Sequence, residues 1–127
     1  DHTRYRDEVI ERWGRAAYDE GAQWWRSLSR HEKDDFRRRA LEIAAEFGRA
    51  HAAGRRPDSD EVQALVRRHY EWVEAGWQGR RPTAEQFTGL GQMYVEDPRF
   101  AKIYDRHGEG TPAFVRDAMT VFAERGL

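Results

Sequence analysis

Residues 29–47 read SRHEKDDFRRRALEIAAEF, and this stretch decides the fold class of the chain. Ser29 followed by Glu32 makes a Ser-x-x-Glu capping box, which is typical of the first turn of a helix. Apolar residues then recur with the spacing of one helix face, at Phe36, Ala40, Ile43 and Phe47. The stretch therefore predicts an amphipathic helix that starts at Ser29 and ends near Gly54.

Helical spacing continues downstream, and no window of the sequence alternates in the way that a strand does. Polar caps mark the later helix starts, at Asp58 or Ser59, at Thr83 with Gln86, at Asp97 before Pro98 and at Thr111 before Pro112. Two further apolar stripes follow, one of Val62, Val66, His69 and Val73 and one of Phe87, Leu90, Gly91 and Tyr94. The chain is therefore predicted to be all-α, a single irregular bundle of five to six helices in one domain, residues 1–127.

The first 27 residues carry a weaker version of this pattern. Apolar side chains recur about four residues apart, at Tyr5, Val9, Ile10, Trp13 and Ala17. Gly14 and Gly21 interrupt the segment, and glycine inside a helix costs about 1 kcal/mol relative to alanine. We expect this segment to be the least stable part of the chain.

Composition excludes several classes of protein. The chain has 22 basic and 23 acidic residues and a net charge of -1, which argues against a domain that binds nucleic acid by itself. It has no cysteine, so a disulfide, a thiolate nucleophile and a cysteine-ligated zinc site are impossible. No apolar run approaches the roughly 18 residues of a membrane span, and no signal peptide is visible. We expect a cytoplasmic protein without a membrane partner. Because the chain starts at Asp1 rather than Met, we expect it to be a fragment, which leaves room for an upstream segment.

The histidines and carboxylates form no catalytic or metal-binding pattern. No two histidines are spaced i, i+4, and no His-Glu-x-x-His motif is present. His69 lies on an apolar stripe, so haem ligation is one interpretation, but a core histidine with a hydrogen-bonded partner is favoured over it. Glu42 and Glu46 are four residues apart, as on a solvated helix face. We expect no enzymatic activity, no metal and no cofactor.

The aromatic residues are the best candidates for a binding site. The chain has five Trp, five Tyr and six Phe, and such side chains line the concave sites that hold bulky apolar ligands. Trp24 and Trp25 are adjacent, so both cannot face one core, and Trp72 and Trp77 bracket a helix end and a loop. The aromatic residues predicted to be plain core side chains are Trp13, Phe36 and Phe47.

A specific run late in the chain adds a family resemblance. Residues 90–100 read LGQMYVEDPRF. Supporting matches occur in order at residues 11–14 (ERWG), Ala17-Tyr18, Ser29, residues 57–59 (PDS), His69 and residues 114–118 (FVRDA). Together they cover nearly all of the chain and resemble the TipAS antibiotic-recognition domain.

The resemblance implies a globin-like, all-helical fold without haem and with a deep ligand cleft. It implies the effector domain of a MerR-type activator, joined by a dimerising coiled coil to a winged helix that binds DNA. The family's ligands are bulky antibiotics, notably thiopeptides, over which the N-terminal helices fold on binding. Residues 1 to about 27 are accordingly expected to form a flexible lid. DNA is expected to be contacted only through an upstream domain absent from this chain, in a full-length homodimer.

One departure from the family affects the mechanism. The best-known member traps its ligand through a cysteine in the loop before the Leu-Gly-x-Met-Tyr helix, whereas residues 77–86 contain none here. We therefore expect non-covalent binding of a bulky, largely apolar antibiotic-like molecule. The residues predicted to contact it are Trp24, Trp25, Trp72, Trp77, Phe87, Gly91, Met93 and Tyr94.

Three alternatives stay open at this point. A stand-alone resistance protein that only sequesters drug would use the same pocket, and a native start near residue 1 would favour it. A haem globin would show a Soret band. A protein-interaction module would respond to no small molecule.

Overall fold

The computed structural model describes residues 2–127 and contains no strand in that range. Its helices are α1 (His2–Trp13), α2 (Arg15–Ser27), α3 (Arg30–Ala52), α4 (Asp60–Gly76), α5 (Ala84–Glu96), α6 (Pro98–Asp105) and α7 (Thr111–Gly126). Asp1, with which the predicted lid begins, and the side chain of Tyr5 lie outside the described part of the chain. The predicted all-α class is confirmed.

Side-chain caps fix most of the helix starts. Ser29 accepts a hydrogen bond from the Glu32 backbone at 3.1 Å, and the Glu32 carboxylate accepts one from the Ser29 backbone at 2.8 Å. Thr83 and Gln86 make the same reciprocal pair at the start of α5. Ser59 caps α4, and Asp97 caps α6 ahead of Pro98. These predicted caps are confirmed because each satisfies backbone N–H groups that the first helical turn leaves without partners.

Two helix boundaries differ from the prediction. Gly14 has a φ of 93°, which breaks the first segment into α1 and α2 and gives seven helices over residues 2–127 instead of five to six. Gly21 lies inside α2 and does not interrupt it. Thr111 is the first residue of α7 and not its cap, because Gly110 holds the cap position in a left-handed conformation.

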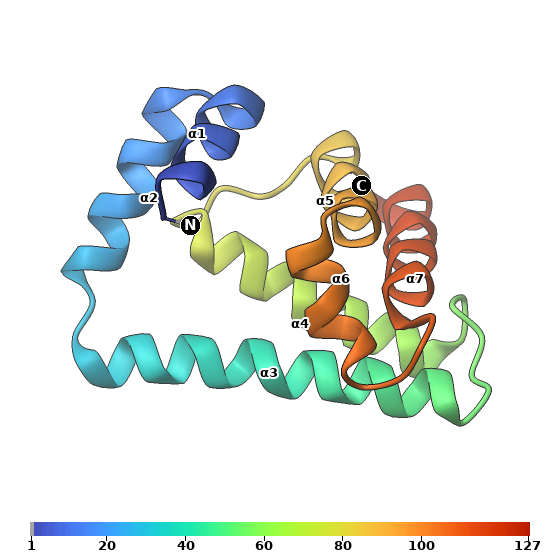
Figure 1. Ribbon diagram of the computed structural model, residues 1–127. Coiled ribbons are helices and arrows are strands. Elements are labelled where there is room, and N and C mark those ends of the chain that lie inside the picture. The colour runs from blue at the N-terminus through green and yellow to red at the C-terminus, as the bar shows by residue number, and fades with distance from the viewer. Residues whose placement is uncertain (1) are drawn as a thin grey trace.

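The helices gather at the two ends of α3, which has 23 residues and is the longest helix described. Figure 1 shows α3 along one side of the molecule, with α1 and α2 standing over its N-terminal end. Helices α5, α6 and α7 gather over its C-terminal half, and α4 runs back between the two groups. The first two helices form a hairpin, here called the N-terminal hairpin (residues 2–27).

The core lies between α3, α4, α5 and α7, and it uses the predicted stripes. Every residue of the α4 and α5 stripes is buried, His69 and Gly91 included. Ile43 and Phe47 of the α3 stripe are buried too, and Phe47 is 0% exposed. Phe36, predicted to be a core side chain, is only half-buried and lies outside the core. It precedes Ile43 by about two turns, and its ring contacts Trp24, Trp25 and Trp72.

Candidate functional site

Six half-buried aromatic side chains meet where the N-terminal hairpin contacts α3 and the end of α4. We call this set the hairpin junction, and its members are Trp13, Trp24, Trp25, Phe36, Trp72 and Trp77. The rings of Phe36 and Trp72 stack with centroids 4.5 Å apart. Trp24 meets Phe36 edge-on at 5.3 Å, and Trp13 meets Trp77 at 5.5 Å. Such ring pairs stabilise the folded state by more than the burial of their apolar area accounts for.

Backbone contacts and cations hold the junction from the α3 side. The Trp72 indole N–H donates to the backbone carbonyl of Phe36 at 3.0 Å, which fixes the plane of the stacked pair. The Arg37 guanidinium lies 4.8 Å from the centre of the Trp25 ring, and the Lys33 ammonium lies 5.6 Å from it. These are cation–π distances, so Trp25 lies between a charged rim and the Phe36 ring.

His69 continues the ring stacking into the core. Its imidazole stacks on Trp72 with centroids 5.9 Å apart, and its Nε2 lies 3.0 Å from the Tyr94 hydroxyl. The Tyr94 hydroxyl is also hydrogen-bonded to Tyr104. Burial lowers the pKa of His69 to about 4, so the imidazole is neutral at neutral pH. The prediction of a core histidine with a hydrogen-bonded partner is confirmed.

The eight predicted ligand contacts fall into two groups. Trp24, Trp25, Trp72 and Trp77 come together at the hairpin junction. Phe87, Gly91 and Tyr94 are buried and belong to the core, and half-buried Met93 packs against it.

The placement of Phe87, Gly91 and Tyr94 corrects the expectation of an accessible cleft wall on α5. A Cβ at Gly91 would lie 3.2 Å from the Arg116 Cα and 3.4 Å from the Met119 sulfur. Gly91 therefore allows α5 and α7 to pack closely and does not leave room for a ligand. A ligand would reach Phe87 or Tyr94 only after the helices had moved apart.

Sequence reasoning assigned two junction residues, Phe36 and Trp13, to the core. Trp13 is half-buried and packs against the core cluster. Phe36 lies outside the core and contacts Trp24, Trp25 and Trp72. The signal available in the sequence was position. Phe36 lies in the first turns of a long helix, and Trp13 directly precedes a helix-breaking glycine.

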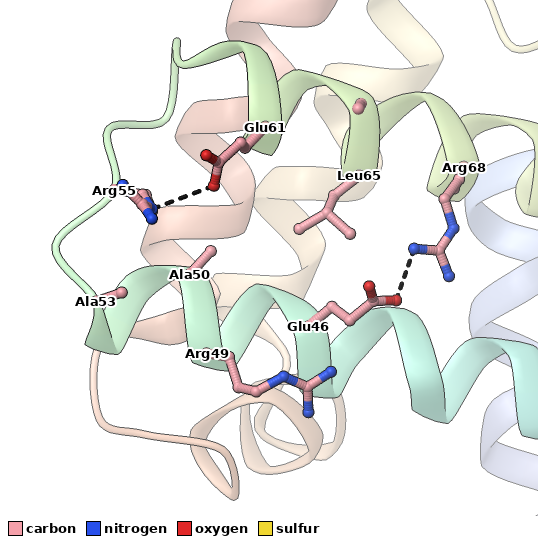
Figure 2. Close-up of a pocket in the computed structure, with 9 residues that line it drawn as sticks. Glu46, Arg49, Ala50, Ala53, Arg55, Glu61, Leu65 and Arg68 are labelled. Atoms are coloured by element: carbon pink, nitrogen blue, oxygen red, sulfur yellow. Dashed lines mark ion pairs between the residues drawn. The ribbon is translucent and has the colours of Figure 1, made fainter.

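A separate groove lies between the end of α3 and the start of α4. It has a volume of about 470 Å³, and its apolar floor includes Ala50, Ala53 and Leu65. Figure 2 shows two ion pairs across it, Arg68 with Glu46 at 2.6 Å and Arg55 with Glu61 at 3.2 Å. The carboxylates neutralise two of its three arginines, which leaves Arg49 as the remaining charged side chain of the lining.

Among the side chains that the structure describes, no cluster of three or more His, Asp or Glu has an arrangement that could hold a metal ion. None of the helices described combines the length and the apolar character needed to cross a membrane.

Half-buried aromatic rings clustered on an all-helical body form a candidate surface for large apolar molecules, of the kind that a ligand-recognition domain has. Comparison with known proteins agrees. The chain belongs to the TipAS antibiotic-recognition domain family, whose model matches residues 5–122.

The similar proteins are bacterial transcriptional regulators. The chain is 33% identical over 98 residues to the HTH-type transcriptional regulator SkgA of Caulobacter vibrioides, an alignment that covers 77% of this chain and 38% of SkgA. It is 31% identical to the HTH-type transcriptional activator TipA of Streptomyces coelicolor, over 98% of this chain and 49% of TipA. The activator mta of Bacillus subtilis is 29% identical over 94% of this chain and 45% of mta. The chain thus spans less than half the length of these relatives.

A solved structure shares the fold. TipAS from Streptomyces lividans, in complex with the thiopeptide antibiotic nosiheptide, superposes with a TM-score of 0.80. The two chains are 29% identical, and the match covers 98% of this chain and 87% of that one.

Proposed function

We propose that this domain binds a bulky, largely apolar antibiotic-like molecule without covalent chemistry, as the effector-sensing domain of a MerR-family transcriptional regulator. The observation that carries the proposal is membership of the antibiotic-recognition family over residues 5–122. The fold match to a thiopeptide-bound TipAS and the regulatory relatives support it.

The hairpin junction is the proposed binding surface. Its six rings are half-buried, so a ligand gains contact area there without first opening the core. Trp24, Trp25, Trp72 and Trp77 are the proposed contacts at this surface, and half-buried Met93 on α5 is a further proposed contact. The chain has no cysteine, so a thiolate cannot capture the ligand. The proposal is that packing and hydrogen bonds hold the ligand reversibly.

The response to the ligand depends on the rest of the regulator, which carries the DNA-binding part. The N-terminal segment, residues 1 to about 27, acts as a lid whose order depends on the ligand, and that change is passed to an upstream DNA-binding part of a homodimer. Such a regulator acts in the cytoplasm and performs no catalysis of its own. The relatives are about twice as long as this chain, which leaves room for a DNA-binding half.

Thermal unfolding with a panel of bulky antibiotics, nosiheptide included, tests the binding. A compound present at about a hundred times its Kd adds roughly 2.7 kcal/mol to the free energy of unfolding. For a domain of this size, that is a rise in Tm of about 10 °C. No rise with any compound of a broad panel would contradict the proposal and favour a protein-interaction module.

Isothermal titration calorimetry of variants, with a compound that raises the Tm, then tests whether the hairpin junction is the binding surface. Trp25→Ala removes a half-buried junction ring, and we expect it to weaken binding about tenfold or more. Leu41→Ala is the matched control, because Leu41 is 54% exposed on α3 and belongs to no aromatic contact described. Equal affinities of the two variants would exclude the junction as the site.

A further inference from the structure

We propose that the ligand of this domain is an aromatic acid, and that Lys33 and Arg37 on α3 bind its anionic group at the charged rim of the hairpin junction. The inference rests on the proposed function, because it takes the hairpin junction as the binding surface. It adds the chemical class of the ligand, in which a carboxylate, phenolate or sulfonate lies beside the apolar rings.

Two cations of α3 lie against one ring of the junction. Lys33 and Arg37 are four residues apart, so their side chains lie on the same face of the helix. The Lys33 ammonium lies 5.6 Å and the Arg37 guanidinium 4.8 Å from the centre of the Trp25 ring. That ring also meets the Phe36 ring at 6.0 Å and the Trp24 ring at 6.2 Å. Positive charge and apolar ring surface therefore occur together at this rim.

The positive charge of the rim is only partly neutralised. Among the side chains that the structure describes, no carboxylate forms an ion pair with Lys33, although Lys33 is half-buried. Arg37 pairs with Asp34 at 3.8 Å, and both of these side chains are more than 60% exposed. A pair so long and so exposed contributes little and is easily exchanged for another anion.

Two further acidic residues near this rim in the sequence are held by other partners. The Glu32 carboxylate accepts a hydrogen bond from the Ser29 backbone N–H at 2.8 Å, as part of the capping box. Asp35 pairs with Arg38. The groove between α3 and α4 differs, because carboxylates already neutralise two of its three arginines. The rim at Lys33 thus keeps positive charge that a ligand can neutralise.

The arrangement favours an acidic ligand over a neutral or cationic one. Rings of the ligand can pack on Trp25 and Phe36 while its anionic group accepts hydrogen bonds from the Lys33 ammonium, which has three donors. Hydrogen bonds between charged groups are stronger than those between neutral groups, and partial burial strengthens them further. A cationic ligand would meet two positive charges that already lie against the Trp25 ring, so like-charge repulsion disfavours it.

Two dyes that differ by one acidic group test this ligand class. Anilinonaphthalene sulfonate and the uncharged phenylnaphthylamine share an aromatic skeleton, and fluorescence titration of the full chain measures a Kd for each. Lys33→Met keeps the apolar stem and removes the charge. We expect it to raise the Kd of the sulfonate dye about three- to tenfold and to leave the Kd of the uncharged dye unchanged. Lys33→Arg keeps the charge and should retain the affinity of the parent protein.

The second lysine of the chain supplies the matched control. Lys102 is exposed on α6, which contributes no residue to the hairpin junction, so Lys102→Met should change neither Kd. Trp25→Ala removes the ring on which both dyes pack, and it should weaken both of them.

The outcomes separate this inference from the proposed function. Equal affinity of Lys33→Met and Lys102→Met for the sulfonate dye would overturn the inference and leave the junction as the proposed binding surface. Equal losses of both dyes in Lys33→Met would overturn it too, because the charge would then make no difference. If neither dye binds the parent protein, or if Trp25→Ala weakens neither, the hairpin junction is not the binding surface and both proposals fail.

Discussion

The buried His69 should make the stability of the domain depend on pH in a specific window. The unfolded chain takes up a proton as the pH falls through about 6.5, the ordinary pKa of histidine. In the folded protein, burial delays that uptake to about pH 4. Between these values the unfolded state binds more protons, so the free energy of unfolding falls as the pH falls. The full contribution is present above pH 6.5.

The magnitude follows from the two pKa values. Their separation corresponds to about 3 kcal/mol, lost progressively between pH 6.5 and pH 4. The contacts of His69 do not offset the free energy needed to protonate its buried imidazole. Its ring contacts Trp72, Phe47 and Phe87, and its polar partner is the neutral hydroxyl of Tyr94.

Urea unfolding of wild type and His69→Gln, followed by circular dichroism from pH 7 to pH 4, measures the effect. Carboxylates such as Asp58, whose pKa Arg56 lowers, also titrate in acid, so the difference between the two proteins isolates the histidine. We expect that difference to change by about 3 kcal/mol over the window. Identical pH profiles, or a His69 imidazole that titrates near 6.5 in NMR spectra, would refute the reasoning.

Further variants test local features by thermal or urea unfolding. Ser29→Ala removes the capping box of α3 and should cost about 1 kcal/mol. Gly89→Ala and Gly91→Ala, two residues apart on α5, should have opposite effects. A Cβ at 89 meets no atom within 4 Å and should stabilise by about 1 kcal/mol, whereas one at 91 crowds Arg116 and should destabilise. Gln78 has a φ of 56°, so Gln78→Gly should stabilise by about 1 kcal/mol, and a loss of stability would show that its side chain contributes more than the strain costs.

Local signals predicted most of the fold. The Ser29, Thr83 and Asp97 caps and the stripes on α4 and α5 are confirmed because each depends on residues within a turn or two of one another. The break at Gly14 could not be predicted with the same certainty. A glycine inside a helical pattern can continue the helix, as Gly21 does, or adopt a positive φ and end it.

The candidate site was harder to predict because its members come from four separate segments. Helical spacing placed Phe87, Gly91 and Tyr94 on one face, but spacing cannot tell whether that face meets a ligand or another helix. In the structure it meets α7 and α4. Phe36 shared a stripe with Ile43, yet a helix of 23 residues is about 34 Å long, so one stripe reaches two different neighbours. Which neighbour covers Phe36 depends on the path of α2, a non-local property.

The placement of the tryptophans has a spectroscopic consequence. All five tryptophans of the chain belong to the hairpin junction, whereas α5, α6 and α7 contain none. Intrinsic tryptophan emission therefore comes from the N-terminal hairpin and the surface it packs on, while circular dichroism averages over all the helices. If the N-terminal hairpin detaches before the core unfolds, the emission maximum should shift to longer wavelength at a lower urea concentration than the loss of ellipticity. In the unmodified protein, tryptophan emission thus reports on the hairpin junction, and ellipticity reports on global folding.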